Sequence, residues 1–462
     1  MREEGLPTGL ALLVAGTFFM ENLDGTILAT AAPQMARSFG VQSSEIGVCL
    51  TAYLLTLAVL IPISGWLADR LGARRTYVGA IVVFTAASLL CAASNSLGEL
   101  VVMRILQGIG GAMMVPVGRL VVLRAVGKQD MIRAIAYLTW PALVAPILAP
   151  AIGGLLTTYA SWHWIFLINV PLGVVAVVAA CKLMPSTVGV TGRRLDWAGF
   201  IGSAVGLGSL MYLAALLGQP QPRWLPIVLF AITAVGVGAL TVRHLRVTPH
   251  PLLALDVLRT TTFRAAHAGG SIFRAAISAV PFLLPLMFQD GFGWTPARAG
   301  LIVLFVFVGN LAIKPLTTPM LHRFGFRVTL VIATLAAMVC IAACALLSAR
   351  TPVPVIALLL VAGGAFRSIG FSAYNTIAFA DVEQPAMNNA NTLAATIQQL
   401  TQGLGVAVAV VALRISQVFF AGTLAYRSAF VVLGALVGMA AIGAVSLPRT
   451  AGDPLRASLR SA

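Results

Sequence analysis

Two carboxylic acids, Glu21 and Asp24, stand in the first long apolar stretch of the chain. Their i, i+3 spacing places them on one face if the segment is helical. Residues 8–20 are apolar, but as a helix they are only about 20 Å long, against a hydrocarbon core of about 30 Å. The segment therefore spans a bilayer only if it continues to about residue 32, which puts both acids inside the membrane.

An acid at that depth costs about 3 kcal/mol on insertion scales, so two of them are expected to have a purpose. One purpose is the exchange of a proton for a bound substrate. The alternatives are a structural ion pair, or a helix that ends before the acids. Arg104, in another apolar run, needs a partner if it is buried, and Glu21 or Asp24 would supply it. Otherwise Arg104 lies at the interface and extends its side chain to water.

The composition indicates which solvent surrounds these groups. Of the 462 residues, 59% are hydrophobic and only 10% are charged, more apolar surface than a soluble domain can bury. The net charge of +16 comes from short basic loops rather than from one basic block, which argues against a nucleic-acid partner. The five cysteines have no C-x-x-C spacing, and we expect neither a metal site nor a cofactor. No G-x-x-x-x-G-K-[ST] motif is present, so an ATP-driven pump is disfavoured.

The elements that must position these residues are membrane-spanning helices. Fourteen apolar runs are long enough to span, and they lie near 9–32, 43–64, 76–95, 99–121, 136–160, 164–184, 196–217, 224–243, 265–288, 297–318, 328–348, 353–374, 390–412 and 428–447. With the N-terminus in the cytoplasm, only five of the 30 lysines and arginines fall on external loops: Arg37, Arg223, Arg298, Arg350 and Arg427. This bias predicts that both termini are cytoplasmic.

A charged loop occurs twice, after the second and the tenth span. Residues 65–75 read G-W-L-A-D-R-L-G-A-R-R, and residues 318–327 repeat the Arg, Gly and Arg at a constant offset, with His322 in place of Asp69. The repeat predicts two six-helix bundles, residues 1–185 and 263–462, with residues 186–262 carrying two inserted helices. In the first copy we expect Gly65 to allow close helix contact and Asp69 to face a helix N-terminus.

Other polar or helix-breaking residues within the spans keep two interpretations each. Pro146, Pro150, Gly153 and Gly154 follow Pro141 in one span, which we expect to be bent and close-packed, as a packing feature or as a hinge or cavity wall. Lys314 and Arg367 could extend to the interface, whereas Arg274 lies too deep for that. Asp290 pairs with a cation or caps a loop. The stripe Gln398, Gln399 and Gln402 lines a cavity or bonds a neighbouring helix.

Several of these segments resemble the major facilitator superfamily, and within it the 14-helix drug:proton antiporter family. The segments that match are residues 23–33, the loop at 65–75, residues 104–112 (R-I-L-Q-G-I-G-G-A), residues 145–154 and residues 162–173. The strong part covers the first 175 residues; the remainder matches in layout. Ala145 and Ala149 replace glycines that are usual in the antiporter motif.

The resemblance implies an all-α polytopic membrane protein with the major facilitator fold. It implies that Asp24 is the proton or substrate carboxylate and Arg104 its relay partner, with Gln107 in the same motif. It also implies that Asp69 and Arg70, with Gly65, Gly72 and Arg74, form a conformational latch. Glu21 is outside the general motif, and its role rests on spacing alone.

The expected function is proton-coupled efflux of small amphipathic, drug-like compounds across the inner membrane, without enzymatic chemistry. The expected partners are a small-molecule substrate, protons and the lipid bilayer, for a protein that acts as a monomer or with accessory export components. Alternatives are an exporter or flippase of a lipid-like or endogenous metabolite, and a non-transporting scaffold or sensor. A scaffold has no need of Glu21, Asp24 and Arg104 in lipid, which separates it from the transporters.

Overall fold

The computed structural model describes residues 8–125, 131–185, 195–218, 223–249, 251–383 and 386–445. Within these ranges every regular element is a helix. The predicted positions of the two chain ends, and the loop at 186–194, lie outside them.

The first half of the chain forms one helical bundle. In it α1 packs along α5, α4 packs between α2 and α3, and α7 packs against α3. Its helices are α1 (Thr8–Phe39), α2 (Gly47–Leu71), α3 (Ala73–Ala92), α4 (Leu97–Ala125), α5 (Met131–Tyr159), α6 (Trp164–Leu167) and α7 (Asn169–Leu183), with a short 3-10 turn, η1 (Ser43–Ile46), before α2.

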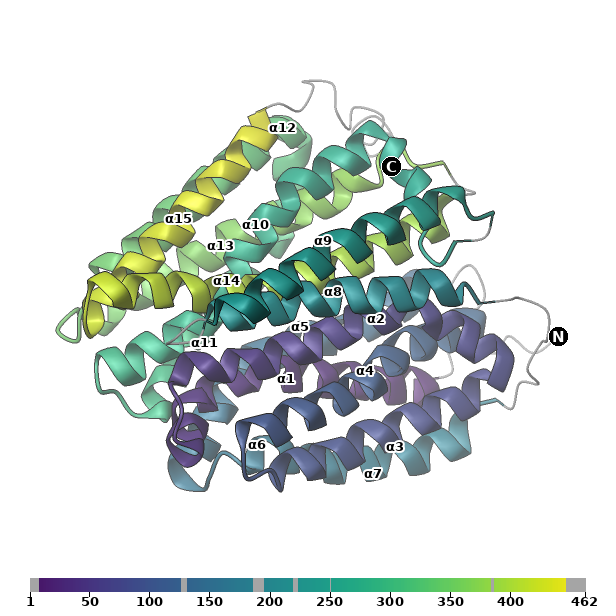
Figure 1. The fold of residues 1–462 in the computed structure, drawn as a ribbon, viewed down its shortest axis with the longest axis horizontal. Coiled ribbons are helices and arrows are strands. Elements are labelled where there is room, and N and C mark those ends of the chain that lie inside the picture. Colours follow the sequence, from purple (N-terminus) through teal and green to yellow (C-terminus); the bar gives the residue numbers. More distant parts are fainter. Residues whose placement is uncertain are drawn as a thin grey trace.

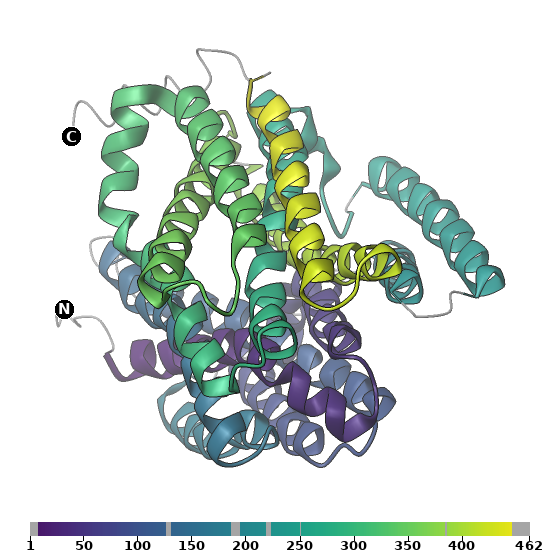
Figure 2. The same ribbon diagram turned by 90° about the vertical axis from the view of Figure 1, so that its left-hand side faces the viewer.

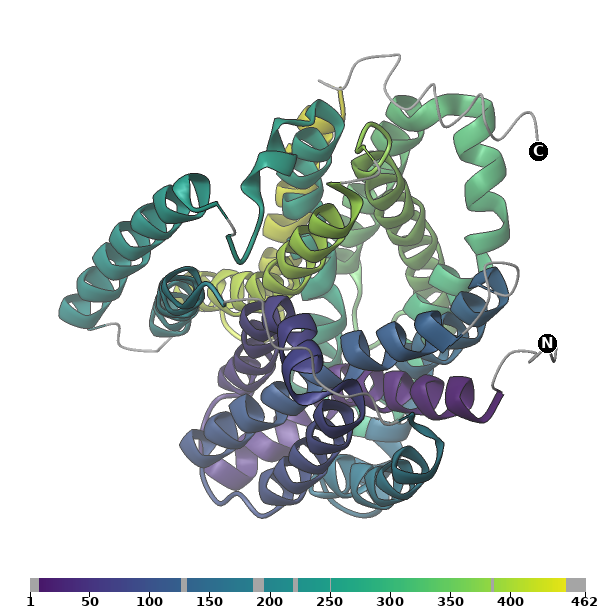
Figure 3. The same ribbon diagram turned by 90° about the vertical axis from the view of Figure 1, so that its right-hand side faces the viewer.

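The second half forms a similar bundle, in which α10 packs on α14 and α15, and α12 packs between α13 and α15. Its helices are α10 (Thr261–Leu286), α11 (Pro296–Ala312), α12 (Lys314–Ala343), α13 (Val353–Ala378), α14 (Met387–Phe419) and α15 (Thr423–Val445). Figure 1 shows the purple-to-blue first bundle below the green-to-yellow second one, and the two bundles meet in the same order in the end-on views (Figures 2 and 3).

The length argument for the first helix is confirmed. The helix α1 runs unbroken for 32 residues and carries both acids in its interior, so it does not end before them. In the described part of the chain, 12 helices are long and apolar enough to cross a membrane, or 13 if α11 and the start of α12, bent by 43°, form one broken span. The apolar part of α5, Val144–Tyr159, is shorter than these helices. The number fourteen therefore stays a prediction.

The repeated loop has a shared backbone conformation. Gly72 separates α2 from α3 with φ 88°, and Gly325 interrupts α12 with φ 76°. Residues other than glycine rarely adopt such backbone angles, so the turn in each copy requires its glycine. The match supports the internal repeat that the sequence predicts.

The helices α8 (Trp197–Leu217) and α9 (Trp224–Val247) form a pair outside both bundles. The helix α8 contacts α2 of the first bundle and α14 of the second, and α9 packs on α8. Figures 2 and 3 show this teal pair projecting to one side. The two helices thus form a hairpin beside the bundles, and their origin as an insertion between two halves stays a prediction.

Asp196 holds this hairpin at its first turn. Its Oδ1 accepts the N–H of Gly199 at 2.8 Å and lies 2.7 Å from Nε2 of His244 on α9, while Oδ2 accepts the N–H of Leu252 at 3.1 Å. Burial favours a raised pKa, but these hydrogen bonds outweigh it and hold the pKa of Asp196 below its usual value. Because the folded-state pKa is depressed, the stabilisation is present at neutral pH and is lost as the pH falls into the acid range.

Asp196→Ala is expected to destabilise the α8–α9 hairpin by about 1 kcal/mol, since it removes a helix cap and leaves three groups unpaired. Hydrogen exchange of the backbone amides at 199 and 252 measures the change. Asp256→Ala, at a side chain that is 83% exposed, is the matched control. Equal protection in both variants would contradict the role given to Asp196.

Candidate functional site: a buried ion pair beside a cavity

The buried ion pair predicted for Arg104 is formed with Asp24 and not with Glu21. Oδ2 of Asp24 lies 2.5 Å from Nη1 of Arg104, and the two residues are 1% and 0% exposed. Arg104 is therefore not an interfacial arginine. Its guanidinium also faces the ring of Tyr53, 4.2 Å from the ring centre. A charge pair taken out of water in this way depends on both members being present.

Uncharged side chains complete the surroundings of Asp24. Oδ1 accepts hydrogen bonds from Nε2 of Gln107 at 2.9 Å and from Nδ2 of Asn169 at 3.1 Å. Gln107 also donates to Oγ of Ser88 at 2.7 Å and accepts from Arg104 at 2.6 Å. The carboxylate of Asp24 thus has partners on both oxygens, supplied by α4 and α7.

Glu21 has a different environment, although it lies one turn from Asp24. It is 9% exposed, and its Oε2 is buried without a hydrogen-bond partner among the described residues. It lines a cavity of about 370 Å³ between the two bundles, within the size range of small-molecule sites. Of the two acids, Glu21 is the one that faces the cavity, whereas Asp24 does not line it.

Both bundles build the walls of this cavity. The first bundle contributes Glu21, Tyr53 and Pro146 of α5. The second contributes aromatic rings and a polar group of side chains: Phe282, Phe307, Phe371, Asn310, Lys314, Arg367, Ser368, Gln398, Gln399 and Gln402. The glutamine stripe therefore lines a cavity, and Lys314 and Arg367 face it instead of extending to the membrane interface.

Two further charged residues of the second bundle, Arg274 and Asp290, do not line the cavity. Arg274 is 2% exposed and donates to Oδ1 of Asn375 at 2.7 Å. Asp290 accepts from the hydroxyl of Tyr426 at 3.3 Å, so in the described part of the chain its partner is a phenol and not a cation.

The glycines of α4 allow the close helix contact that the sequence predicts. A Cβ on Gly108 would lie 2.7 Å from Cβ of Thr56, and one on Gly110 would lie 2.6 Å from the backbone nitrogen of Phe84. This approach brings α4, and with it Arg104, against α2 and α3.

One end of the cavity is closed by contacts between the bundles. This end, where α1 ends and α2 begins, is named the α1–α2 end. Gly154 of α5 packs on the carbonyl of Pro296, and Gly300 of α11 packs on the carbonyl of Pro150. Hydrogen bonds cross the seam from Gln289 Nε2 to Thr30 O at 2.9 Å, from Ala297 N to Thr158 Oγ1 at 2.9 Å, and from Thr51 Oγ1 to Gly403 O at 3.4 Å.

Gly300→Ala is expected to open the α1–α2 end, because its Cβ would overlap the carbonyl oxygen of Pro150. Overpacking of this kind costs about 1–3 kcal/mol, enough to shift a two-state population strongly. Cross-linking of a Thr158→Cys/Ala297→Cys pair measures closure, and the yield should fall. Gly16→Ala on α1, whose Cβ would have no neighbour within 4 Å, is the control. An unchanged yield in Gly300→Ala would show that the glycine contact does not set closure.

Comparison with known proteins identifies the family. The sequence pattern of the Major Facilitator Superfamily matches residues 14–406 and 266–461. The chain belongs to the major facilitator superfamily. It is 40% identical to a protein of Pectobacterium atrosepticum provisionally named multidrug resistance protein MdtD, over 86% of this chain and 85% of that one. The Escherichia coli (strain SMS-3-5) protein of the same name is also 40% identical, over 86% and 84% of the two chains.

Solved structures of major facilitator transporters share the fold. A D-xylose–proton symporter superposes with a TM-score of 0.69 at 14% identity, over 97% of this chain and 99% of the other. A bacterial homologue of the human lysosomal transporter Spinster, solved in an inward-facing, unoccupied conformation, gives 0.67 at 14% identity, over 98% and 99%. This major facilitator is therefore a multi-pass membrane transporter and not an enzyme.

The loop at 65–75 of this major facilitator contacts its own bundle. Arg70 lies over the ring of Trp66, 5.2 Å from its centre, and Arg74 donates to the carbonyl of Cys181 on α7. Asp69 lies in the last turn of α2. The expectation for Gly65 is wrong in this conformation, since a Cβ there would have no neighbour within 4 Å.

Three members of the site were not predicted as functional. Asn169 stands in a segment quoted for its resemblance, and an amide within an apolar span is a usable signal. Tyr53 separates the ion pair from the cavity, and Ser88 supports Gln107. Tyrosine and serine are too common in membrane helices for the sequence to single these two out.

Proposed function

We propose that this transporter exports small amphipathic compounds in exchange for protons, by alternating access of the cavity to the two sides of the inner membrane. The observation that carries the proposal is the carboxyl of Glu21. It faces a cavity between two bundles, unpartnered, one turn from a carboxylate that an arginine already neutralises. The names of the MdtD relatives support the substrate class.

The coupling follows from competition at one group. Protonated, Glu21 adds no charge to the cavity; deprotonated, it changes the charge that a substrate meets. Exchange requires that the cavity hold the proton and the substrate in turn, so that one is released before the other binds. Asp24, Arg104 and Gln107 serve in this scheme as the polar network behind Glu21, and the predicted role of Asp24 as the coupling acid stays a prediction.

Alternating access requires that the two bundles move relative to each other. We propose that residues 1–185 and 263–462 are the moving bodies and that residues 186–262 are an inserted pair. With both termini in the cytoplasm, the closed α1–α2 end faces outward and the cavity is reached from the cytoplasm. The seam at Gly154 and Gly300 would open in the outward-facing state.

Purified protein in liposomes with an imposed pH gradient tests the proposal. Ethidium and neutral and anionic amphiphiles of similar size serve as probes, each with and without a protonophore. The expected result is movement of at least one probe against the proton flow, lost when the protonophore collapses the gradient. Probe movement that ignores the gradient would remove proton coupling from the proposal.

We also propose that the loop at 65–75 acts as a latch, and Asp69→Asn tests it. No residue of the loop lines the cavity, so the variant should lower the transport rate while substrate affinity changes little. A slowdown of about tenfold corresponds to about 1.4 kcal/mol on the access step. Flux and equilibrium binding on the same preparation separate the two quantities, with Glu99→Gln, an exposed acid in the first turn of α4, as the control. Equal losses in affinity and rate would contradict a latch.

A further inference from the structure

The cavity is asymmetric in charge, and this asymmetry bears on what it binds. On the first bundle the buried cation, Arg104, has a carboxylate partner in Asp24. On the second bundle Lys314 and Arg367 both line the cavity. Neither has an acidic partner among the described residues, and the acid that shares the cavity, Glu21, lines the wall of the other bundle.

The contacts that Lys314 and Arg367 do make leave their charge uncompensated. Nζ of Lys314 donates to Oγ of Ser372 at 2.9 Å. The guanidinium of Arg367 lies over the ring of Phe307, 5.5 Å from its centre. Its Nη1 and the hydroxyl of the neighbouring Ser368 are buried, and neither has a hydrogen-bond partner in the part of the chain that the structure describes. Donors are thus available at this wall, and like charges face the same space.

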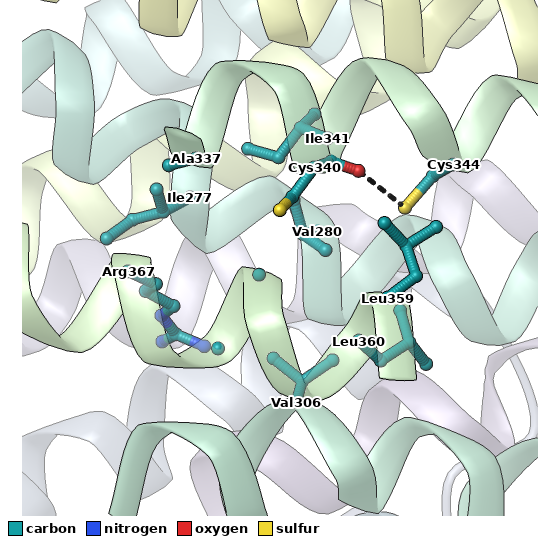
Figure 4. Close-up of a pocket in the computed structure, with 12 residues that line it drawn as sticks. Ile277, Val280, Val306, Ala337, Cys340, Ile341, Cys344, Leu359, Leu360 and Arg367 are labelled. Atoms are coloured by element: carbon teal, nitrogen blue, oxygen red, sulfur yellow. Dashed lines mark hydrogen bonds between the residues drawn. The ribbon is translucent and has the colours of Figure 1, made fainter. Parts of the chain in front are cut away.

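Beyond the cavity, no residue that the structure describes supplies a counter-ion for Arg367. Arg367 also borders a second pocket of about 30 Å³, shown in Figure 4, whose other described lining residues are apolar or cysteine. Arg274, behind the wall, adds a further cation: it lies over Phe371 at 5.6 Å and bonds an amide rather than an acid. An uncompensated charge in such a place is costly unless a ligand or an ion completes it.

We propose that the transported compound carries an anionic group, a carboxylate or a phosphate, that Lys314 and Arg367 bind, with its apolar body against Phe282, Phe307 and Phe371. This inference rests on the proposed transport function and names the substrate class. The cargo is an amphipathic organic acid.

Binding of matched probes to the purified full chain tests the inference. Phenylbutyrate, phenylbutyl phosphate, phenylbutyramide and phenylbutylammonium share a carbon skeleton and differ in the head group; inorganic phosphate tests the head group alone. The expected result is that one or both acids bind at least about tenfold more tightly than the amide. Comparing the two acids distinguishes a carboxylate from a phosphate ligand.

Variants assign the preference to the two cations. Lys314→Gln and Arg367→Gln should each weaken acid binding by about tenfold with the amide unchanged, and the double variant should bind acid and amide equally. The charge-preserving Lys314→Arg and Arg367→Lys variants should keep the preference. Arg264→Gln, an exposed arginine on α10 outside the cavity, is the matched control and should also keep it. Amide binding reports in every variant whether the cavity has formed.

Three results would overturn the inference: equal binding of acid and amide by the wild type, tightest binding of the ammonium probe, or an acid preference that survives in the double variant. If Lys314 and Arg367 only neutralise Glu21, the wild type should bind acid and amide equally. Proton-driven flux of phenylbutylammonium without acid preference would leave the transport proposal intact. Acid binding without any proton-driven flux would support the anionic ligand class and contradict the transport proposal.

Discussion

Glu21→Gln is expected to abolish proton-driven accumulation while leaving exchange of substrate for substrate intact. The glutamine preserves the size and hydrogen bonding of the side chain but holds no exchangeable charge. For one proton exchanged per substrate, a gradient of one pH unit supplies about 1.4 kcal/mol, enough for about a tenfold substrate gradient. The Glu21→Gln variant should hold no substrate gradient. Counterflow in liposomes of equal internal and external pH checks that binding and the access change survive.

The control for this experiment changes an acid to its amide outside the site. Asp256→Asn, at an exposed position before α10, should accumulate substrate as the wild type does. If Glu21→Gln still accumulates substrate to the wild-type level, the proton is carried by another group. The network at Asp24 is then the next place to examine.

Asp24→Asn is expected to destabilise the folded protein by about 3–5 kcal/mol, because it leaves the buried charge of Arg104 without a partner. That is a large share of the roughly 5–15 kcal/mol by which proteins are stable. The double variant Asp24→Asn/Arg104→Gln removes both charges and should recover most of the loss. Thermal unfolding of the wild type, both single variants and the double variant measures the coupling energy of the pair.

Transport by the double variant then separates the two alternatives that the sequence leaves open. If the pair is structural, the double variant should be stable and should still move substrate. If Asp24 takes part in coupling, it should be stable and inactive. A single Asp24→Asn variant as stable as the wild type would contradict the coupling of the pair that the 2.5 Å contact indicates.

Features governed by length and by the cost of burying charge were predictable from the sequence. The continuation of α1 past Met20 is required by the thickness of a bilayer, and the structure confirms it. The pairing of Arg104 with an acid of α1 is required by the cost of a lone buried charge, and it too is confirmed. The repeat at 65–75 and 318–327 can be read from the sequence, and in the structure each copy has a glycine with positive φ.

The rotation of each helix about its axis could not be predicted. Glu21 and Asp24 are one turn apart, and spacing alone places them on the same face, yet one lines the cavity and the other binds Arg104. Lys314 could equally have reached the interface. In a helix that is apolar nearly all round, hydrophobic periodicity does not say which side faces lipid and which faces the partner bundle. The contact of Gly154 with Pro296 requires the bundles to be docked first.

The position of the α8–α9 hairpin has a consequence for lateral entry. The two bundles meet along two flanks that face the lipid, one formed by α2 and α14 and the other by α5 and α11. An amphipathic compound dissolved in the bilayer could enter the cavity only between the helices of one of these flanks. The hairpin lies across the first of these, with α8 against both α2 and α14. Lateral entry of such a compound from the lipid would therefore have to take place along α5 and α11, the flank that the hairpin does not cover.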